Sequence, residues 1–443
     1  MRIQLSEHFT YKKLLRYVFP AIVMMVFSST YSVIDGLFIS NFVGKTAFAA
    51  INLIMPLLMG MSTVGAMIGA GGSALISKTL GEGKHERANR LFTMLICLTV
   101  GIGFVLTVIG LIFIEQIAAA LGATGQLLAD SVLYARIMLV FQISMMLQMV
   151  FQSLFATAEK PKLGLGITVA AGIANILLDA LFIVVFRWGL VGAVVATVIS
   201  QLIGGVVPLF YFARKNNSLL RFAKPVFFKK DIGQVFINGS SEMMTNISVS
   251  IVSVLYNLQL MKALGENGIA AYGVIMYVYY IFVAIFMGYS IGCAPIIGYH
   301  YGAENHTELN NLLKKGLVLM GIFGVGLTVI AEAVAAPLSY IFVGYDTELL
   351  QITIYGFRLF SLSFLITGFN MFASAFFTAL NNGFVSATIS FARTLLFQTL
   401  AVLTLPIFLG IKGIWLAVTL AEVLTLVLSI VFFIKNRKRY HYA

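Results

Sequence analysis

The uncharged stretch over 47–77, AFAAINLIMPLLMGMSTVGAMIGAGGSALIS, decides the fold, because it is long enough to cross a bilayer as a helix. Eleven further apolar runs follow one another along the chain with short polar breaks between them. They are continuously apolar rather than alternating, so they predict helices and not the strands of a barrel. The twelve predicted spans are 16–40, 47–77, 91–114, 131–157, 163–186, 189–213, 233–260, 268–298, 315–340, 351–379, 384–408 and 413–434.

The composition agrees with an all-α integral membrane protein. Of the 443 residues, 60% are hydrophobic and only 10% are charged, whereas a soluble domain carries about 25% charged residues. The net charge of +12 is scattered between apolar runs, so no nucleic-acid partner is expected, and membrane lipids are. The sequence contains no P-loop, no catalytic Ser or Cys set, no HExxH and no dinucleotide-binding glycine pattern, so neither an enzyme nor an organic cofactor is expected.

The basic residues predict the orientation of the spans. If the N-terminus is cytoplasmic, the inside segments hold 22 of the 29 Lys and Arg residues. The outside loops then hold four, which are Lys45, Arg187, Lys262 and Lys412, and three more fall within spans. This bias follows the positive-inside rule. A multi-pass protein of the plasma (inner) membrane with both termini in the cytoplasm is therefore expected.

The second half of the chain repeats the first at an offset of 221 residues. FAAINLIM at 48–55 aligns with IAAYGVIM at 269–276, and Gly81 and Gly302 occupy matching positions. Six spans in each copy place both copies in the membrane in the same sense, which predicts two six-helix lobes related by a pseudo-twofold axis along the membrane normal. The predicted units are an N-lobe over 1–215, a basic linker over 216–230 and a C-lobe over 231–443, with a substrate path between the lobes.

Two acids at membrane depth in the first lobe are candidates for an ion site, because a buried charge in a span usually faces a cavity or a partner. Asp35 lies in the first span and Asp179 in the fifth, and Asn175 precedes Asp179 by four residues on the same helical face. Thr197 in the sixth span would add a hydroxyl oxygen. Oxygen ligands suit Na⁺, and carboxylates can also carry protons. In the alternative interpretation, both acids are capping or interfacial residues that reach loop water.

The second lobe does not repeat these acids. Asp35 corresponds to Tyr256 and Asp179 to Leu400, so ion coupling is predicted to reside in the first lobe. Glu332 and Glu422 are predicted to pair with arginines or to approach an interface. Arg136 is expected to anchor the membrane interface or to pair with an acid, and no role is assigned to Glu242, Arg358 or Arg393.

The motifs VIDGLFI at 33–39, NILLD at 175–179 and GLVGAVVAT at 189–197 resemble the multidrug and toxic compound extrusion (MATE) transporters over nearly the whole chain. The resemblance implies export of cationic and amphipathic drugs by antiport with Na⁺ or H⁺. It also implies a cation site at Asp35, Asn175, Asp179 and Thr197, with Tyr134 lining the nearby cavity.

The sequence departs from one branch of that family. The branch typified by NorM has further acids in mid-span 7 and in span 10, where this chain has Tyr256 and Asn370. The pattern is closer to the DinF-like and MepA-like branches, in which first-lobe acids carry the coupling.

The sequence therefore favours a monomeric secondary transporter with small drugs or toxins as substrates and with no metal beyond the coupling ion. A flippase for lipid-linked precursors is the first alternative. It is disfavoured because only three arginines lie within spans. A non-transporting membrane scaffold or receptor is the second, and it would be supported by large soluble domains or long charged tails.

Overall fold

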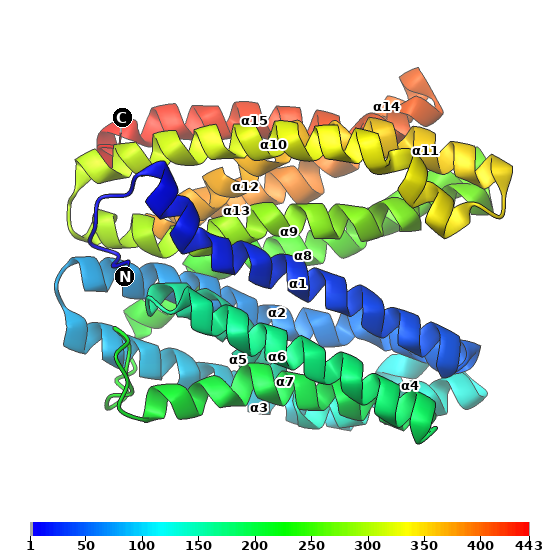
Figure 1. Cartoon of the computed structure of the whole chain (residues 1–443), viewed down its shortest axis with the longest axis horizontal. Coiled ribbons are helices and arrows are strands. Elements are labelled where there is room, and N and C mark those ends of the chain that lie inside the picture. Colours follow the sequence, from blue (N-terminus) through cyan, green and yellow to red (C-terminus); the bar gives the residue numbers. More distant parts are fainter. Residues whose placement is uncertain (1–2, 443) are drawn as a thin grey trace.

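The structure is a computed structural model that describes residues 3–442, apart from the side chains of residues 37, 40 and 45. Its helices form two bundles that lie side by side (Figure 1). The first bundle contains α1 (Tyr11–Phe42), α2 (Lys45–Gly81), α3 (His85–Ala120), α4 (Gly125–Val140), α5 (Gln142–Thr157), α6 (Pro161–Asp179), the π-helix η1 (Ala180–Val185) and α7 (Gly189–Ala213). The second contains α8 (Lys229–Leu264), α9 (Glu266–Gly302), α10 (His306–Val343), α11 (Thr347–Ser361), α12 (Phe364–Ala379), α13 (Gly383–Phe391), the π-helix η2 (Ala392–Leu396), α14 (Phe397–Leu409) and α15 (Ile411–Tyr440).

The number of membrane spans agrees with the prediction. Within residues 3–442, ten helical segments are long and apolar enough to cross a bilayer, and two bent pairs raise the number to twelve. The predicted spans over 131–157 and 351–379 are each formed by a bent pair of helices. The first is broken between α4 and α5 with a bend of 57°, and the second between α11 and α12 with a bend of 47°. Hydropathy detects the length of an apolar run and not a change in its direction.

The predicted repeat is visible in the backbone. Gly189 begins α7 with a φ of +57°, and Gly410 precedes α15 with a φ of +58°. These two residues are 221 positions apart, and both adopt the left-handed conformation that glycine accepts without a steric cost. The breaks in the two bent spans match in the same way, because Phe141 after α4 corresponds to Leu362 after α11. The two halves therefore share their turns and their kinks as well as their sequence.

The two bundles pack along α1 and α2 of the first against α8 and α9 of the second, and α2 crosses α9 at the end of the molecule that carries both chain termini (Figure 1). A Cβ atom built on Gly81 would lie 1.9 Å from the backbone oxygen of Tyr299. The matching atom on Gly302 would lie 2.0 Å from the backbone oxygen of Lys78. Since Gly81 matches Gly302 and Lys78 matches Tyr299 at the 221-residue offset, this crossing is the reciprocal contact expected at a twofold axis.

Substitution of Gly81 by Ala tests how tightly the bundles are joined. We expect Gly81→Ala to destabilise the protein by about 1–3 kcal/mol, because the new methyl group meets backbone atoms that cannot rotate away. Thermal unfolding of the purified protein in detergent measures this loss. A Cβ atom added to Gly101 on α3 would meet no neighbouring atom within 4 Å, so Gly101→Ala is the matched control and should leave stability unchanged or raise it slightly. Equal effects of the two substitutions would contradict the close crossing.

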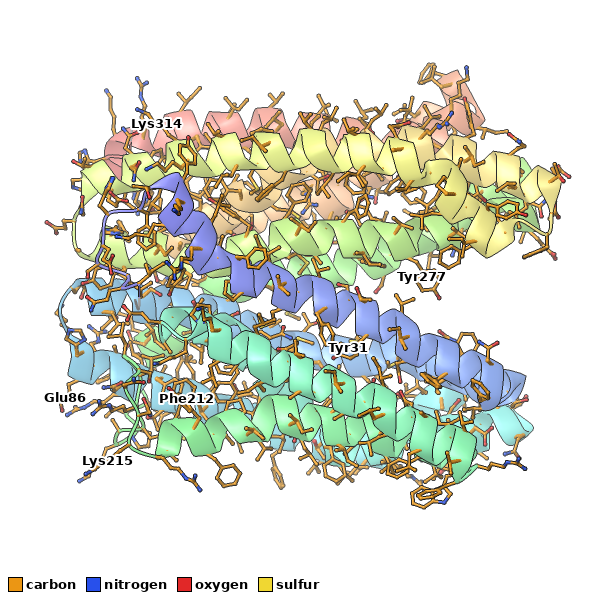
Figure 2. The ribbon with its side chains drawn as sticks, in the orientation of Figure 1. Tyr31, Glu86, Phe212, Lys215, Tyr277 and Lys314 are labelled. Atoms are coloured by element: carbon orange, nitrogen blue, oxygen red, sulfur yellow. The ribbon has the colours of Figure 1, made fainter. Side chains whose placement is uncertain are left out.

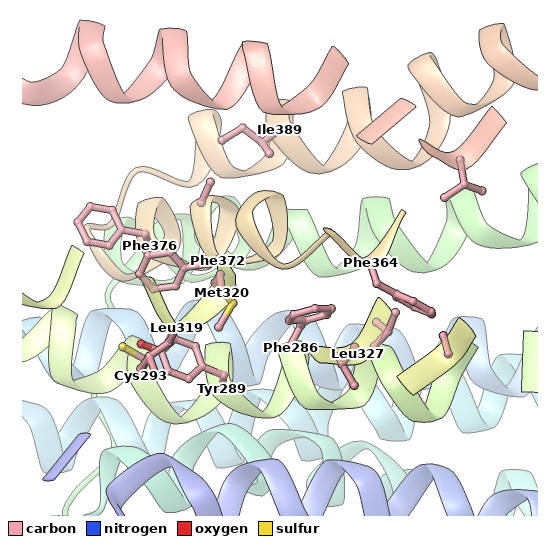
Figure 3. Packing of buried hydrophobic residues seen from close by; sticks show 14 of the residues in the cluster. Phe286, Tyr289, Cys293, Leu319, Met320, Leu327, Phe364, Phe372, Phe376 and Ile389 are labelled. Carbon is pink, nitrogen blue, oxygen red and sulfur yellow. The ribbon is translucent and has the colours of Figure 1, made fainter. Parts of the chain in front are cut away.

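The apolar core is distributed differently in the two bundles. The second bundle has one continuous cluster, which includes Phe286, Phe364 and Phe372 (Figure 3). The first bundle has two separate clusters. One is centred on residues such as Phe92 and Phe151, and the other on residues such as Tyr134 and Ile183. The break between these two clusters is the position of the candidate site.

Candidate functional site

A layer of buried polar side chains separates the two apolar clusters of the first bundle. Gln142 and Gln148 on α5, Asn175 on α6 and Gln201 on α7 are all buried in it. The Nε2 atom of Gln142 donates a hydrogen bond of 2.8 Å to the hydroxyl of Ser62 on α2. Buried amides are costly unless they have partners or a ligand, so a polar layer at this depth indicates a site rather than ordinary core packing.

Close packing of α1 against α6 brings the predicted acids to this layer. Gly172 on α6 lies so near α1 that an added Cβ would come within 2.5 Å of the Phe27 ring and 2.9 Å of the Tyr31 ring. α6 carries Asn175 and Asp179 one and two helical turns beyond Gly172, and α1 carries Asp35 one turn beyond Tyr31. The glycine therefore allows the polar faces of the two helices to meet.

Asp35 and Asp179 face each other across the contact between α1 and α6. Asp35 interacts with the side chains of both Asp179 and Asn175. Asp179 and Asn175 are buried. Even so, both carboxylate oxygens of Asp179 and Oδ1 of Asp35 have no partner at hydrogen-bonding geometry among the described residues. Two carboxylates with unoccupied oxygens in a buried layer form an arrangement that a bound cation or proton would stabilise.

The chain leaves regular α-helical geometry directly after Asp179. α6 ends at Asp179, and the next six residues form the π-helix η1. π-helical segments are uncommon and occur frequently at functional sites. Gly192 at the start of α7 packs against Phe182 of this segment. Gly192 of the motif at 189–197 thus contacts the segment that directly follows Asp179.

The other two predicted site residues lie at different distances from the acids. The Tyr134 side chain on α4 is buried and experiences the charges of both Asp35 and Asp179. The hydroxyl of Thr197 instead donates a hydrogen bond of 3.0 Å to the carbonyl of Ala193 in its own helix. Among the described residues, no contact joins this hydroxyl to either acid. Four of the five predicted residues therefore come together, and Thr197 does not join them in this structure.

Tyr31 is a neighbour of the acids that was not predicted from the sequence. It lies on α1 next to α6 (Figure 2), interacts with the side chains of Ser28 and Gln148, and experiences the charge of Asp35. The signal was available, because Tyr31 precedes Asp35 by four residues and so lies on the same helical face. Tyr31 links the acidic pair to the amides of the polar layer.

The arginines within spans all have acidic partners. Arg136 lies 3.5 Å from Glu115, Arg358 lies 3.8 Å from Glu332, and Arg393 lies 2.8 Å from Glu422. The prediction that Glu332 and Glu422 pair with arginines is therefore confirmed.

The last of these pairs extends into a buried polar network. Asn370 donates a hydrogen bond of 2.7 Å to Glu422, and Arg393 also experiences the charge of Glu242 on α8. This network belongs to the second lobe and lies apart from the acidic pair of the first.

The first-lobe arrangement can hold a hard monovalent cation or protons. Its donors are carboxylate and amide oxygens, which suit such ions better than they suit transition metals. Within the described part of the chain, no group of three or more His, Cys, Asp or Glu residues is placed to hold a metal. The site could thus take a transported or coupling ion, and it has none of the ligand sets of a metal-dependent enzyme.

Comparisons with known proteins agree with this geometry. The model of the MatE family matches residues 20–181 and 242–403, one segment in each half of the chain. The chain is 28% identical over 333 residues to the multidrug export protein MepA of Staphylococcus haemolyticus, covering 74% of this chain and 73% of that protein. It is 24% identical over 316 residues to MepA of Staphylococcus aureus strain MRSA252, covering 70% and 69%.

Solved structures share the whole fold. One is described as the outward-facing conformation of a multidrug resistance MATE family transporter of the MOP superfamily. It superimposes with a TM-score of 0.91 at 22% identity, covering 99% of this chain and 97% of the other. Another, described as MATE in the bent conformation, gives a TM-score of 0.87 at 22% identity over 97% and 96% of the two chains. At 22% identity, these similarities show that the arrangement of the helices is shared.

Proposed function

This chain belongs to the MatE family of transporters, and from that premise we propose that it exports cationic and amphipathic drugs in exchange for Na⁺ or H⁺. The family transports rather than catalyses, so the protein is a multi-pass membrane transporter and not an enzyme. The relatives named multidrug export proteins support drugs as the substrate class.

The observation that carries the ion-coupling part of the proposal is the pair formed by Asp35 and the buried Asp179. Among the described residues, both oxygens of Asp179 lack hydrogen-bonding partners, and an ion arriving from outside would interact with them. The arrival of one monovalent ion reduces the net negative charge of the pair and so changes the packing of α1 against α6. Coupling requires only that the ion and the drug have different affinities for the two access states.

The arrangement of the lobes supports alternating access. The glycine crossing at Gly81 and Gly302 joins the bundles at the end that carries the termini, and the ribbons diverge towards the opposite end (Figure 1). We place the termini in the cytoplasm on the distribution of basic residues. In this arrangement the cytoplasmic side is closed. Separation of the bundles at the crossing would open the space between them to the cytoplasm, which is the step that export requires.

A flippase for anionic lipid-linked precursors is the second candidate, and the ion pairs disfavour it. Such a substrate needs cationic side chains without partners in the central region. Here each of Arg136, Arg358 and Arg393 already faces a carboxylate. The charges left without a partner at membrane depth in the first lobe are acidic, which suits a cationic substrate or ion.

Transport by the purified full-length protein in liposomes tests the proposal and identifies the ion. A fluorescent organic cation is loaded inside, and its efflux is followed with an inward Na⁺ gradient at fixed pH, and separately with an inward proton gradient without Na⁺. We expect one of the two gradients to drive efflux above that of protein-free liposomes. Absence of efflux under both gradients would contradict the proposal and favour the flippase or the scaffold.

A further inference from the structure

The segment that joins the two bundles carries an uncompensated positive charge. Between α7 and α8, the chain from 214 to 230 contains six basic residues and no acidic one. All six side chains are exposed, and none forms an ion pair within the described residues. They are Arg214, Lys215, Arg221, Lys224, Lys229 and Lys230. Basic residues that serve only to orient the protein during membrane insertion need no fixed arrangement in the folded molecule. A fixed arrangement of these residues would therefore indicate a further role.

The segment is held against α3 and is not a loose tether. The backbone nitrogen of Arg221 donates a hydrogen bond of 2.8 Å to the Asn89 side chain, and that of Ala223 donates one of 2.9 Å to Thr93. The Phe222 ring packs on Phe92 with centroids 5.1 Å apart. These contacts hold the backbone around Phe222 against α3, so the basic residues on either side of it stay on one face of the first bundle.

Exposed aromatic rings accompany the basic residues. Phe227 is 56% exposed and Phe228 is 46% exposed, immediately before α8 begins at Lys229. α7 ends at Ala213, so the segment connects the ends of two helices that are long and apolar enough to span a membrane. Aromatic and basic side chains at the ends of such helices are typical of contacts with the membrane interface.

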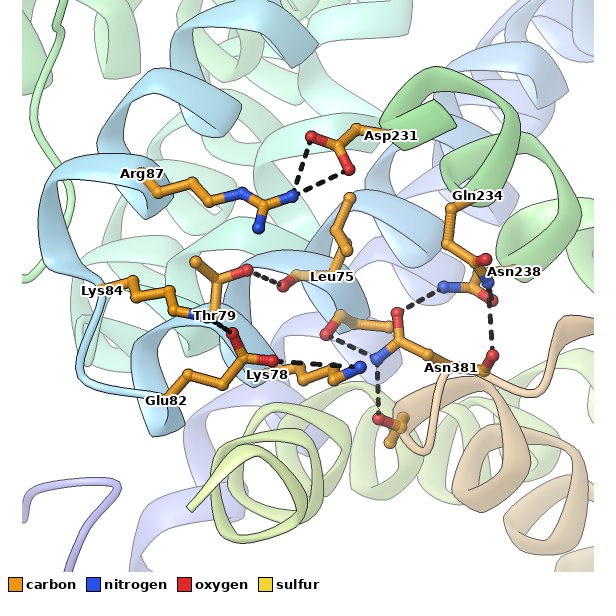
Figure 4. A network of polar contacts seen from close by, with 12 residues as sticks. Leu75, Lys78, Thr79, Glu82, Lys84, Arg87, Asp231, Gln234, Asn238 and Asn381 are labelled. Atoms are coloured by element: carbon orange, nitrogen blue, oxygen red, sulfur yellow. Dashed lines mark hydrogen bonds and ion pairs between the residues drawn. The ribbon is translucent and has the colours of Figure 1, made fainter. Parts of the chain in front are cut away.

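An open hollow lies at one end of the segment, and a shallow surface depression lies at the other. The first, of about 530 Å³, is lined by Glu86, Arg87, Arg90, Phe228, Lys230 and Asp231. Its two acids are already paired, because Arg87 bonds Asp231 at 3.1 Å (Figure 4) and Arg90 pairs with Glu86. The other, of about 520 Å³, is lined by Tyr211, Lys215, Asn216 and Asn217. Lys230 and Lys215 thus provide positive charge without an ionic partner beside hollows in the surface.

We propose that this joining segment, from Arg214 to Lys230, binds the anionic headgroups of phospholipids in the adjacent leaflet. The lipid phosphate contacts the lysines, and Phe227 and Phe228 enter the boundary of the acyl chains. The neighbouring surface of α7 exposes apolar side chains, Phe210 and Val207, on which acyl chains can lie. This continuity with lipid-facing helix favours a membrane lipid over a nucleic acid or a soluble acidic protein.

Tryptophan fluorescence tests the proposal in the full-length protein. Phe227→Trp in a Trp188→Phe background places an indole on the segment and leaves only the buried Trp415 as a second one. The protein is reconstituted with brominated phosphatidylglycerol or brominated phosphatidylcholine, which quench nearby indoles. We expect the affinity of the site for phosphatidylglycerol to be at least about fivefold higher than for phosphatidylcholine. One basic residue contributes about 1 kcal/mol, and this corresponds to about a fivefold preference.

Neutralised variants decide whether these lysines are responsible. Lys215→Gln/Lys224→Gln/Lys230→Gln removes the lysine beside each hollow together with Lys224 and should lower the preference, while Arg214, Arg221 and Lys229 remain. The matched control Arg187→Gln/Lys262→Gln/Lys412→Gln removes three bases at the other end of the spans and should leave it unchanged. Equal quenching by both lipids, or an unchanged preference in the first variant, would overturn the proposal. Both leaflets of the bilayer have the same lipid composition, and no transport is measured. The outcome therefore depends neither on the orientation of the protein in the bilayer nor on the proposed function.

Discussion

Replacement of Asp179 by Asn is expected to reduce gradient-driven drug efflux to the rate of membranes without the protein. The substitution keeps the shape of the side chain, but it removes the charge that would hold Na⁺ and the oxygen that would carry a proton. Asp179 is buried, and among the described residues neither of its oxygens has a partner at hydrogen-bonding geometry, so the Asn side chain would have no charge with which to hold the ion. Gradient-driven uptake of a fluorescent cation into everted membrane vesicles, which corresponds to export from the cell, measures the effect.

The control for this prediction lies in the same lobe. Asp130 on α4 accepts a hydrogen bond of 2.7 Å from Gln126 near the start of that helix, away from the polar layer. Asp130→Asn removes the same charge and should retain efflux. Both variants must be present in the membrane in equal amounts. Undiminished efflux by Asp179→Asn would remove Asp179 from the coupling site.

Asp35 should behave as part of the same unit. If the two carboxylates hold one ion together, Asp35→Asn alone abolishes efflux, and the double variant is no worse than either single variant. Separate sites would instead give single variants with partial activity. The contact of Asp35 with Asp179 across α1 and α6 favours the first outcome.

The sequence was sufficient for the spans, for the repeat and for part of the site. Span length and the 221-residue offset are local properties, and the matching turns at Gly189 and Gly410 follow from them. The spacing of Asn175 and Asp179 also fixes a shared helical face without reference to any other helix. Properties that a single helix determines were therefore predictable.

Properties that depend on two helices do not follow from the spacing of residues in one segment. The approach of α1 to α6 at Gly172 brings Asp35 to Asp179, and their common site was expected only from the depth of both acids and from the family resemblance. The spacing of Tyr31 and Asp35 shows their shared helical face, but the interaction of Tyr31 with Gln148 of α5 is not visible in the sequence. The hydroxyl of Thr197 is satisfied within its own helix, an option that sequence spacing does not distinguish from coordination.

Replacement of Glu422 by Gln should destabilise the second lobe by about 3–5 kcal/mol, because it leaves Arg393 buried without its counter-charge. The Arg393 and Glu422 side chains are only 11% and 4% exposed, and their ion pair measures 2.8 Å. Glu242 also acts on Arg393, but no described ion pair joins them, so it does not replace the lost partner. Thermal unfolding in detergent measures the difference.

Two further variants separate loss of the charge pair from loss of shape. Arg393→Met/Glu422→Met removes both charges and should regain at least half of the lost stability, because paired apolar replacements avoid an isolated buried charge. Glu332→Gln breaks the more exposed pair with Arg358, in which the atoms lie 3.8 Å apart, and should cost less than about 1 kcal/mol. If Glu422→Gln lowered the stability no more than Glu332→Gln does, the Arg393–Glu422 pair would not be a structural element. Its charges would then be available to move during transport.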